Sequence, residues 1–363
     1  MFHSALARLL VALGALLASA AVAIGCGGDN GGGGPTIALL LPENQTPRYE
    51  SADRPYFEDE VDRICSDCEI LYSNATEDAA KQQGQAEAAL TQGADVLVLD
   101  PVDAASAAAI VQKAKQQDVP VVSYDRLVLN SDVDYYVSFD NVQVGRLQAQ
   151  SLSGKLKSDG NPSGPIVMIN GDPADSNAAL FKQGAMSGFQ ASGVEVAQEY
   201  DTPGWLASKA QDEMQQAITA LGKEGFKAVY AANDDTGGGA IAAMRSAGID
   251  PASRPTTGQD ATVAGLQRII AGQQYMTVYK AIRPEASITA QIAVDLARGR
   301  TPSQSQITDQ LDNGQKKVPS VLLQPVAVTR DNVRQTVIRD GFVTTSELCT
   351  GPYAQACQEA GIS

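Results

Sequence analysis

The stretch that decides the fold is GQDATVAGLQRIIAGQQYMTVYKAI, at residues 258–282. A β-prone lead-in ends at Asp260, and the pattern that follows predicts a helix over 262–271 and a strand over 275–279 that leads into Lys280. The helix is predicted from apolar residues that recur at helical spacing, which are Val263, Leu266, Ile269 and Ile270. A carboxylate and an ammonium group therefore lie at the ends of two strands that one helix connects.

Asp260 and Lys280 suit a ligand that carries several hydroxyl groups. Ligands of α/β sheets gather at the carboxyl ends of the strands, where side chains leave the rigid sheet. A carboxylate accepts hydrogen bonds from hydroxyl groups and an ammonium group donates three, which matches a polyol. The two residues alone are explained more simply by a surface ion pair, so the choice depends on the rest of the chain.

Strands and helices alternate along most of the chain, which predicts parallel sheets. The first alternation begins with a strand at 36–41 and ends with a strand at 135–139. A long helix over 142–156 follows, and a second alternation runs from a strand at 166–169 to a strand that ends before Asp260. The predicted fold class is therefore α/β, with two doubly wound parallel-sheet lobes rather than one long sheet.

Longer motifs occur in one order along the chain. They are SYDR (123–126), DVDYYVSFDN (132–141), NAALF (177–181), ANDDTGGGAI (232–241), LDNGQKKVPS (311–320) and TVIRDGF (336–342). With GQDA at 258–261, this series resembles the D-xylose-binding proteins of ABC transporters, which are type I periplasmic sugar-binding proteins. The resemblance covers nearly the whole mature chain and implies two lobes joined by a hinge of three chain crossings, near 139–141, 280–283 and 324–327.

The resemblance also implies how the chain divides. We expect an N-terminal lobe from 36–140 and 282–324, and a C-terminal lobe from 141–281 and 325–345. The remaining segments are a signal peptide at 1–25, a Gly-rich tether at 26–35 and a Cys-containing tail at 346–363.

The N-terminus resembles a bacterial lipoprotein signal. Leu9–Ile24 is an uncharged apolar run, shorter than the ~20 residues that a membrane span needs, and fits the apolar region of a signal peptide. The tetrad ending at Cys26 (AIGC) is similar to a lipobox, with Ala where Leu is usual, and GGDNGGGG follows as a flexible tether. We therefore expect a lipid on Cys26, which would hold the protein at the membrane outside the cytoplasm. The alternative is ordinary secretion with Cys26 as an unpaired thiol.

The composition argues against several classes of partner and cofactor. The net charge of −15, from 27 basic and 42 acidic residues, lacks the basic footprint that nucleic acid requires. One His and five Cys without metal-ligand spacing argue against a zinc site. The calcium-loop spacing that the glucose/galactose-binding relatives carry is absent from the sequence. We therefore expect neither a metal nor a cofactor.

The four remaining cysteines form two local pairs. Cys65 and Cys68 follow a predicted helix, and Cys349 and Cys357 lie in the polar tail. In an exported chain such pairs favour disulfides, Cys65–Cys68 and Cys349–Cys357. The alternative for the first pair is a thioredoxin-like redox site, but that motif belongs at the start of a helix.

Further polar residues follow other strands. Asp125 and Arg126 come after an apolar strand, and their acceptor and fork of donors can hold adjacent sugar hydroxyls. A loop ion pair explains these two residues equally well, and the resemblance makes both of them sugar contacts. The resemblance also places Arg48, in the predicted loop 42–55, at the sugar, although Arg54 leaves the register open.

The second lobe supplies three more residues by resemblance. Asn177 and Asn233 match sugar ligands, since an amide both donates and accepts. Trp205 matches the family's ring that stacks on the sugar's C–H face. Asp175 is interpreted as a structural residue or a helix N-cap. The run at 237–239 is interpreted as close packing rather than a phosphate cradle, because acidic residues precede it.

These observations predict an extracytoplasmic, lipid-anchored, monomeric sugar receptor that delivers D-xylose to an ABC permease. One alternative is a sensory subunit of the same fold that presents its ligand to a membrane kinase. Others are a glucose or multi-sugar binding protein, a LacI-type repressor and a sugar-converting enzyme. No nucleophile–base pair is evident, and the chain has a signal and tether where a repressor has a helix-turn-helix, so we expect neither an enzyme nor a repressor. The sequence alone does not decide whether the bound sugar is a pentose or a hexose.

Overall fold

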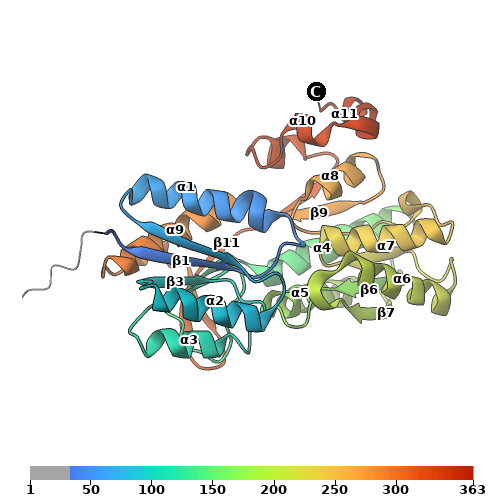
Figure 1. The fold of residues 1–363 in the computed structure, drawn as a ribbon. Coiled ribbons are helices and arrows are strands. Elements are labelled where there is room, and N and C mark those ends of the chain that lie inside the picture. The colour runs from blue at the N-terminus through green and yellow to red at the C-terminus, as the bar shows by residue number, and fades with distance from the viewer. Residues whose placement is uncertain (1–32, 363) are drawn as a thin grey trace, which may run out of the picture. The chain divides into compact units, whose positions relative to one another are not determined.

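The structure is a computed structural model that describes residues 33–362. Its largest sheet has seven strands in the order β10-β11-β5-β4-β3-β1-β2, all parallel to their neighbours except β10 (Figure 1). The strands are β1 (Thr36–Leu41), β2 (Glu69–Asn74), β3 (Val96–Leu99), β4 (Val121–Tyr124), β5 (Tyr135–Phe139), β10 (Asp309–Asp312) and β11 (Lys317–Leu323).

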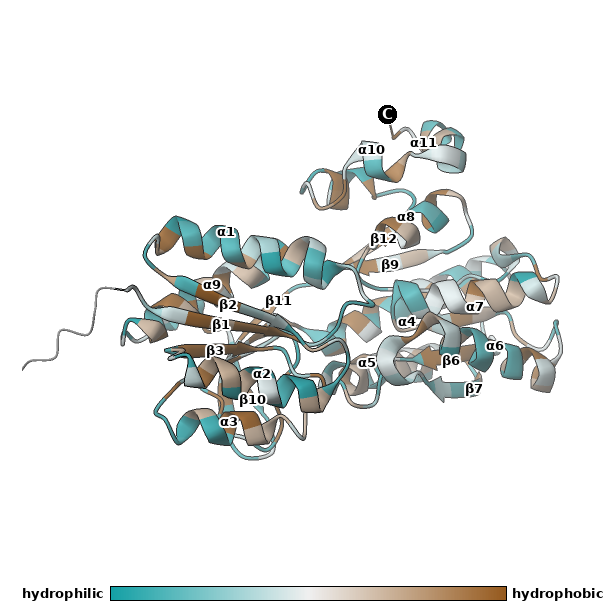
Figure 2. Cartoon of the chain, in the orientation of Figure 1, coloured by the Kyte–Doolittle hydropathy of each residue, from teal (hydrophilic) through white to brown (hydrophobic). Residues whose placement is uncertain are grey.

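Helices cover both faces of this sheet because its strands are apolar on both sides. Alternate residues of β1 separate into two cores, with Ile37, Leu39 and Leu41 on one face and Ala38 and Leu40 on the other. The first core lies under α1 (Arg54–Ile64) and α9 (Ile282–Ala297), and the second under α2 (Ala79–Thr91) and α3 (Ala108–Lys115). In Figure 2 the inner strands β1 and β3 are coloured as hydrophobic, and the outer faces of the helices that cover the sheet are largely hydrophilic.

A second lobe is built around a parallel three-stranded sheet in the order β7-β6-β8. Its strands are β6 (Ile166–Asn170), β7 (Val196–Asp201) and β8 (Ala228–Ala231). One face packs on α4 (Asn141–Ser158) and α5 (Ser176–Ser192), and the other on α6 (Ala207–Leu221) and α7 (Asp234–Ser246). Two doubly wound lobes are therefore present, as the alternation predicts.

The chain passes between the lobes at three points. β5 leads into α4, and β9 (Met276–Tyr279) leads into α9. β11 leads into β12 (Val326–Thr329), which pairs antiparallel with β9. The Asp140 amide donates to the Leu323 carbonyl, at 2.9 Å, and this bond ties the first crossing to the third.

The strand predicted before Asp260 is not a regular strand. Residues 255–260 run extended between β8 and β9, with Thr257 N donating to Val229 O at 3.1 Å and Asp260 N donating to Val278 O at 2.9 Å. Only one isolated bridge, between Val229 and Thr256, is formed, because the segment changes partner after so few residues. The helix predicted after it is α8 (Val263–Ile270).

Two other segments also differ from prediction. The expected loop over 42–55 contains a π-helical turn, Tyr49–Asp53, that continues directly into α1 because Pro55 lies in the first turn, where its missing N–H is tolerated. The polar tail folds into α10 (Thr345–Leu348) and α11 (Ala354–Glu359), which pack on the side of α8 through Leu348, Cys357 and Ile362 (Figure 1).

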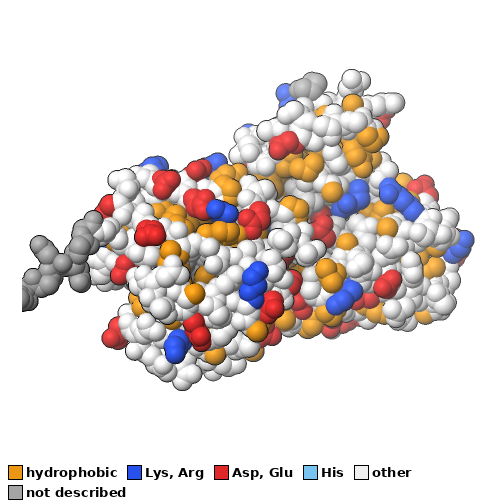
Figure 3. All heavy atoms as spheres, viewed as in Figure 1, with side chains coloured by type: hydrophobic (Ala, Val, Ile, Leu, Met, Phe, Trp, Pro, Cys, Tyr) orange, Lys and Arg blue, Asp and Glu red, His pale blue; other side chains and the backbone are white. Residues whose placement is uncertain are grey.

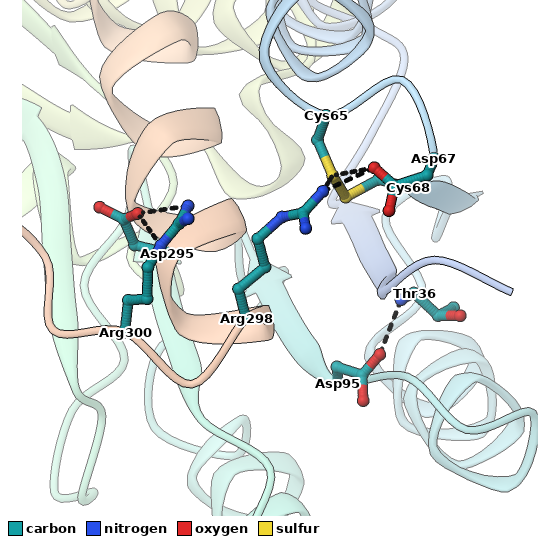
Figure 4. The surroundings of a disulfide bond; sticks show 8 residues. All are labelled: Thr36, Cys65, Asp67, Cys68, Asp95, Asp295, Arg298 and Arg300. Atoms are coloured by element: carbon teal, nitrogen blue, oxygen red, sulfur yellow. Dashed lines mark hydrogen bonds and ion pairs between the residues drawn. A yellow bond between two sulfur atoms is a disulfide. The ribbon is translucent and has the colours of Figure 1, made fainter. Parts of the chain in front are cut away.

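Both expected disulfides are present. Cys65–Cys68 closes the end of α1, with 5.3 Å between the Cα atoms, and Cys349–Cys357 staples the tail, with 5.7 Å. Figure 4 shows Arg298, which follows α9, reaching Asp67 beside the first disulfide, with Nη2 donating to Oδ1 at 2.6 Å. Cys26, the signal and nearly all of the tether lie outside the described residues.

The part of the chain that the structure describes contains no helix long and apolar enough to cross a membrane. On the face shown in Figure 3, acidic and basic side chains are interspersed, and neither forms a continuous patch.

Candidate functional site

A small polar cavity lies between the two lobes, at the carboxyl ends of their strands. It contains about 300 Å³ of space that no atoms fill, part of which is open to solvent. All eight residues that the sequence analysis singles out for ligand binding line it, and these are Arg48, Asp125, Arg126, Asn177, Trp205, Asn233, Asp260 and Lys280. Residues far apart in the chain therefore meet in one place.

Arg48 comes from the segment between β1 and the π-helical turn. Its Nε and Nη2 donate to Asp53 at 2.9 and 2.5 Å, and Nη2 also reaches Glu285 of α9 at 3.1 Å. Nη1 is left to pair with Asp125 Oδ2 at 2.7 Å. Arg54 lies outside the cavity and pairs with Glu58 on α1. The structure thus places Arg48, and not Arg54, at the cavity.

Asp125 directly follows β4 and is held from several sides. Its carbonyl accepts the Tyr136 hydroxyl at 2.8 Å, and its carboxylate accepts the Asn177 amide, from the other lobe, at 2.9 Å. Burial raises the pKa of Asp125, but the positive charges of Arg48, Lys280 and Arg126 outweigh burial, so that the pKa lies below its usual value. The carboxylate is therefore ionised and acts as an acceptor.

Asp260 and Lys280 form the pair that the sequence predicts, and they do so in the interior. Lys280 Nζ lies 3.2 Å from Asp260 Oδ1 and 4.0 Å from Asp125 Oδ2, and both side chains of the Asp260–Lys280 pair are 5% exposed or less. Burial lowers the pKa of Lys280, but Asp125 and Asp260 raise it above the usual value, so the amine stays charged. The surface ion pair offered as the simpler explanation is therefore wrong.

The second lobe contributes its groups from helix starts and one loop. Asp175 caps α5, since its Oδ1 accepts a hydrogen bond from the backbone N–H of Asn177 at 2.8 Å, as the N-cap interpretation predicts. Its other oxygen accepts Trp205 Nε1 at 3.2 Å and lies 3.1 Å from Arg126 Nε of the first lobe. Asn233 caps α7 through Thr236 N at 2.8 Å and also lines the cavity.

Trp205 forms an apolar wall of the cavity. Its ring packs edge-on against Phe181, with 6.4 Å between ring centroids. The indole lies directly over Gly171, where a Cβ atom would fall 2.0 Å from Trp205 Cη2. Glycine at this position, in the loop after β6, is therefore what allows the indole to approach the backbone closely.

Five further residues line the cavity and were not assigned to ligand binding: Thr46, Tyr49, Asp175, Phe181 and Gln259. Each is next to, or within a few positions of, a predicted residue or motif. Gln259 precedes Asp260, and Tyr49 follows Arg48. Closeness in sequence to a predicted site residue is thus the signal that could have found these five residues. It does not show which neighbouring side chain points into the cavity.

The glycine run at 237–239 packs α7 closely, as predicted. A Cβ atom on Gly239 would lie 2.1 Å from the Ala207 carbonyl oxygen at the start of α6. Within residues 33–362 there is no group of three or more His, Cys, Asp or Glu side chains that could hold a metal ion.

The chain matches the family model described as periplasmic binding protein domain over residues 37–301. The chain belongs to the periplasmic binding protein family. This periplasmic binding protein is 37% identical over 316 residues to the D-xylose-binding periplasmic protein of Escherichia coli K12. The aligned residues cover 86% of this chain and 92% of the relative. It is 33% identical to the multiple sugar-binding periplasmic receptor ChvE of Rhizobium radiobacter, over 75% of this chain and 81% of that protein.

A solved structure with the same fold is an ABC transporter solute binding protein from Clostridium phytofermentans with bound β-D-glucose. The TM-score is 0.77 at 28% sequence identity, over 86% of this chain and 99% of the other. Periplasmic binding proteins capture solutes without transforming them, so this family member is a solute-binding protein and not an enzyme.

Proposed function

We propose that the protein is a sugar-binding lipoprotein of an ABC importer and that D-xylose is its sugar. The observation that carries the proposal is the convergence of charged, amide and aromatic side chains from both lobes on one buried cavity. The names of two relatives, a D-xylose-binding protein and a multiple sugar-binding receptor, support the same ligand class.

The chemistry of the cavity suits a small polyol. Carboxylates of Asp125 and Asp260 accept hydrogen bonds, Arg48, Arg126 and Lys280 donate them, and sugar hydroxyls do both. The flat C–H face of a pyranose would pack on Trp205.

A calorimetric titration of the purified protein tests the ligand. D-Xylose, D-glucose, D-ribose, L-arabinose and D-galactose are titrated separately, and D-xylose is expected to bind most tightly. Arg48→Ala should abolish most of the heat, whereas Arg54→Ala, a matched change at the surface-exposed arginine, should leave it unchanged. Failure of all five sugars to bind would refute the proposal.

The second candidate is a glucose or multi-sugar receptor. It is favoured by the multiple sugar-binding relative and by the glucose-bound structure with the same fold. Equal or tighter binding of D-glucose in the same titration would select this candidate over a D-xylose receptor.

The transport role and the lipid anchor are further parts of the proposal. The lipobox-like tetrad and the Gly-rich segment after it support attachment through a lipid on Cys26. Mass spectrometry of the native protein should find a diacylglycerol-modified Cys26 as the first residue. An unmodified N-terminus at any other residue would exclude the anchor. Uptake of labelled sugar by cells lacking the protein distinguishes import from sensing.

A further inference from the structure

Asp100, a buried residue outside the predicted ligand set, has a carboxylate that makes no hydrogen bond within the described structure. Asp100 directly follows β3 and is fully buried, and neither of its carboxylate oxygens accepts a hydrogen bond from residues 33–362. Its backbone is satisfied, since its N–H donates to Leu40 O at 3.0 Å and its carbonyl accepts Gln82 Nε2 at 2.7 Å. Its nearest cation is Arg126, with 3.7 Å between Oδ1 and Nε. A buried carboxylate left this way is costly and calls for an explanation.

Arg126 lies between two carboxylates that belong to different lobes. Asp175 of the second lobe lies 3.1 Å from Arg126 Nε, closer than Asp100 of the first lobe. Asp175 is held in place by its N-cap bond and by Trp205. Arg126 Nη1 and Nη2 donate to first-lobe groups, the Pro101 carbonyl and the Tyr49 hydroxyl, both at 3.3 Å. Its Nε lies nearer to the second lobe's carboxylate, and Asp100 is left with a long contact.

The lobes meet at this point through other bonds. The Ala104 amide donates to the Ala174 carbonyl at 3.0 Å, and the Leu127 amide donates to Ser176 Oγ at 3.0 Å. These bonds connect the loops after β3 and β4 to the segment before and at the start of α5. The structure is therefore in a state in which the lobes are in contact beside Arg126.

Separation of the lobes would change the partner of Arg126. Asp175 moves with the second lobe, while Asp100 and Arg126 stay together, because they follow the neighbouring strands β3 and β4, which pair at Leu99 and Ser123. We propose that Asp100 is a positioning residue that takes over Arg126 when the lobes separate, and that competition between Asp100 and Asp175 for Arg126 sets the balance between open and closed forms. This inference rests on the two-lobed binding site proposed above.

An Asp100–Arg126 pair in the open form would lower the apparent affinity for sugar. Burial raises the pKa of Asp100 well above its usual value, against the pull of Arg126, so the closed form leaves this carboxyl group poorly satisfied. An open form that pairs Asp100 with Arg126 gains stability from that pair. Since apparent affinity is the intrinsic affinity multiplied by the fraction of closed protein, Asp100 lowers the affinity for any sugar.

Paired variants test the inference. Asp100→Asn keeps the shape and prevents the ionised pair with Arg126 that the open form would gain. It should make the unliganded protein more compact in solution scattering and raise sugar affinity by about fivefold. Asp175→Asn should do the reverse, giving a more open unliganded protein and weaker binding. Asp103→Asn, in the same loop after β3 but away from Arg126, serves as the matched control and should change neither quantity.

The outcomes separate the inference from the proposed function. An unliganded radius of gyration that Asp100→Asn leaves unchanged or increases would overturn the role of Asp100, as would a fall in affinity. If Asp100→Asn does not yield folded protein, Asp100→Ser repeats the test, and an unchanged radius of gyration in Asp175→Asn overturns the inference by itself. Scattering of the unliganded variants needs no sugar. This test of Asp100 therefore remains valid even if the wild-type protein binds none of the five sugars.

Discussion

Several residues at the site have strained backbones. Asp125, Trp205 and Asp260 have positive φ angles, of 50°, 53° and 85°. A left-handed conformation of a non-glycine residue costs of order ~1–3 kcal/mol and persists only where the surroundings hold it. For Asp125 and Asp260 the surroundings are backbone bonds to neighbouring strands, from Asp125 N to Val137 O and from Asp260 N to Val278 O, both at 2.9 Å. The strain turns these side chains out of the sheet and toward the cavity.

Asp260→Ala should weaken sugar binding by ~2–5 kcal/mol, because Lys280 would lose its nearer carboxylate and any hydroxyl bonded to Asp260 would lose a charged acceptor in the interior. Calorimetry with the sugar that binds wild-type protein measures the change. Asp309→Ala, at an exposed carboxylate of β10, is the control and should bind like the wild type. An Asp260→Ala affinity within error of the wild type would remove Asp260 from the site.

Asp235 should make the stability depend on pH. Burial and the nearby charges of Asp234 and Asp260 raise its pKa from 3.8 to about 7. The folded protein then binds more protons than the unfolded chain between these values, so the free energy of unfolding rises as pH falls through about 7 toward 4.

Thermal unfolding from pH 8 to pH 5 measures the effect. The melting temperature of the wild type should rise by a few degrees more than that of Asp235→Asn, which cannot titrate at this position. Parallel curves for the two proteins would show that Asp235 does not contribute.

At the scale of elements, the loop after β6 and the loop that carries Trp205 must approach closely. The indole lies on Gly171, so any side chain there displaces it. Gly171→Ala should lower sugar affinity at least tenfold, as expected when an aromatic contact is lost and its neighbours rearrange. Tryptophan fluorescence should shift as well, since Trp205 is the only tryptophan of the chain.

Gly154→Ala provides the matched control for this change. Gly154 lies in α4, and a Cβ atom there has no heavy atom within 4 Å in the described structure. Its affinity and fluorescence should equal those of the wild type. If Gly171→Ala also behaved like the wild type, the close approach of Trp205 would not matter for binding.

At the scale of the whole molecule, the proposed ligands divide between the lobes. Arg48, Asp125 and Arg126 precede the first crossing, Asn177, Trp205, Asn233 and Asp260 follow it, and Lys280 lies at the second crossing. A sugar therefore gains its full set of bonds only when the lobes close, and it stabilises the closed form by that difference. Segments at strand ends, such as the three crossings, commonly absorb a hinge motion.

Saturating sugar should lower the radius of gyration in solution scattering. Asp125→Ala should bind more weakly and leave the protein more open even at saturation, because Asn177 and Lys280 lose their partner across the lobes. An unchanged scattering curve, with a sugar that calorimetry shows to be bound, would contradict closure.

The fold class and the strand-end positions of the polar residues could be predicted from the sequence. Alternating apolar segments are local, and so are the residues that follow them, such as Asp125 and Arg126 after β4 or Lys280 after β9. The two short disulfides could also be predicted, since each joins cysteines close in sequence.

Which polar residues meet, and how they pair, depends on the packing of distant segments and could not be predicted from the sequence. Whether Arg48 or Arg54 turns inward depends on Asp53 and on Glu285, which lies 237 positions from Arg48 in the chain. The burial of the Asp260–Lys280 pair and the dual role of Asp175 depend in the same way on the other lobe. Burial and ion pairing are set by packing between distant segments, and a local sequence pattern carries no information about the partner that arrives from elsewhere.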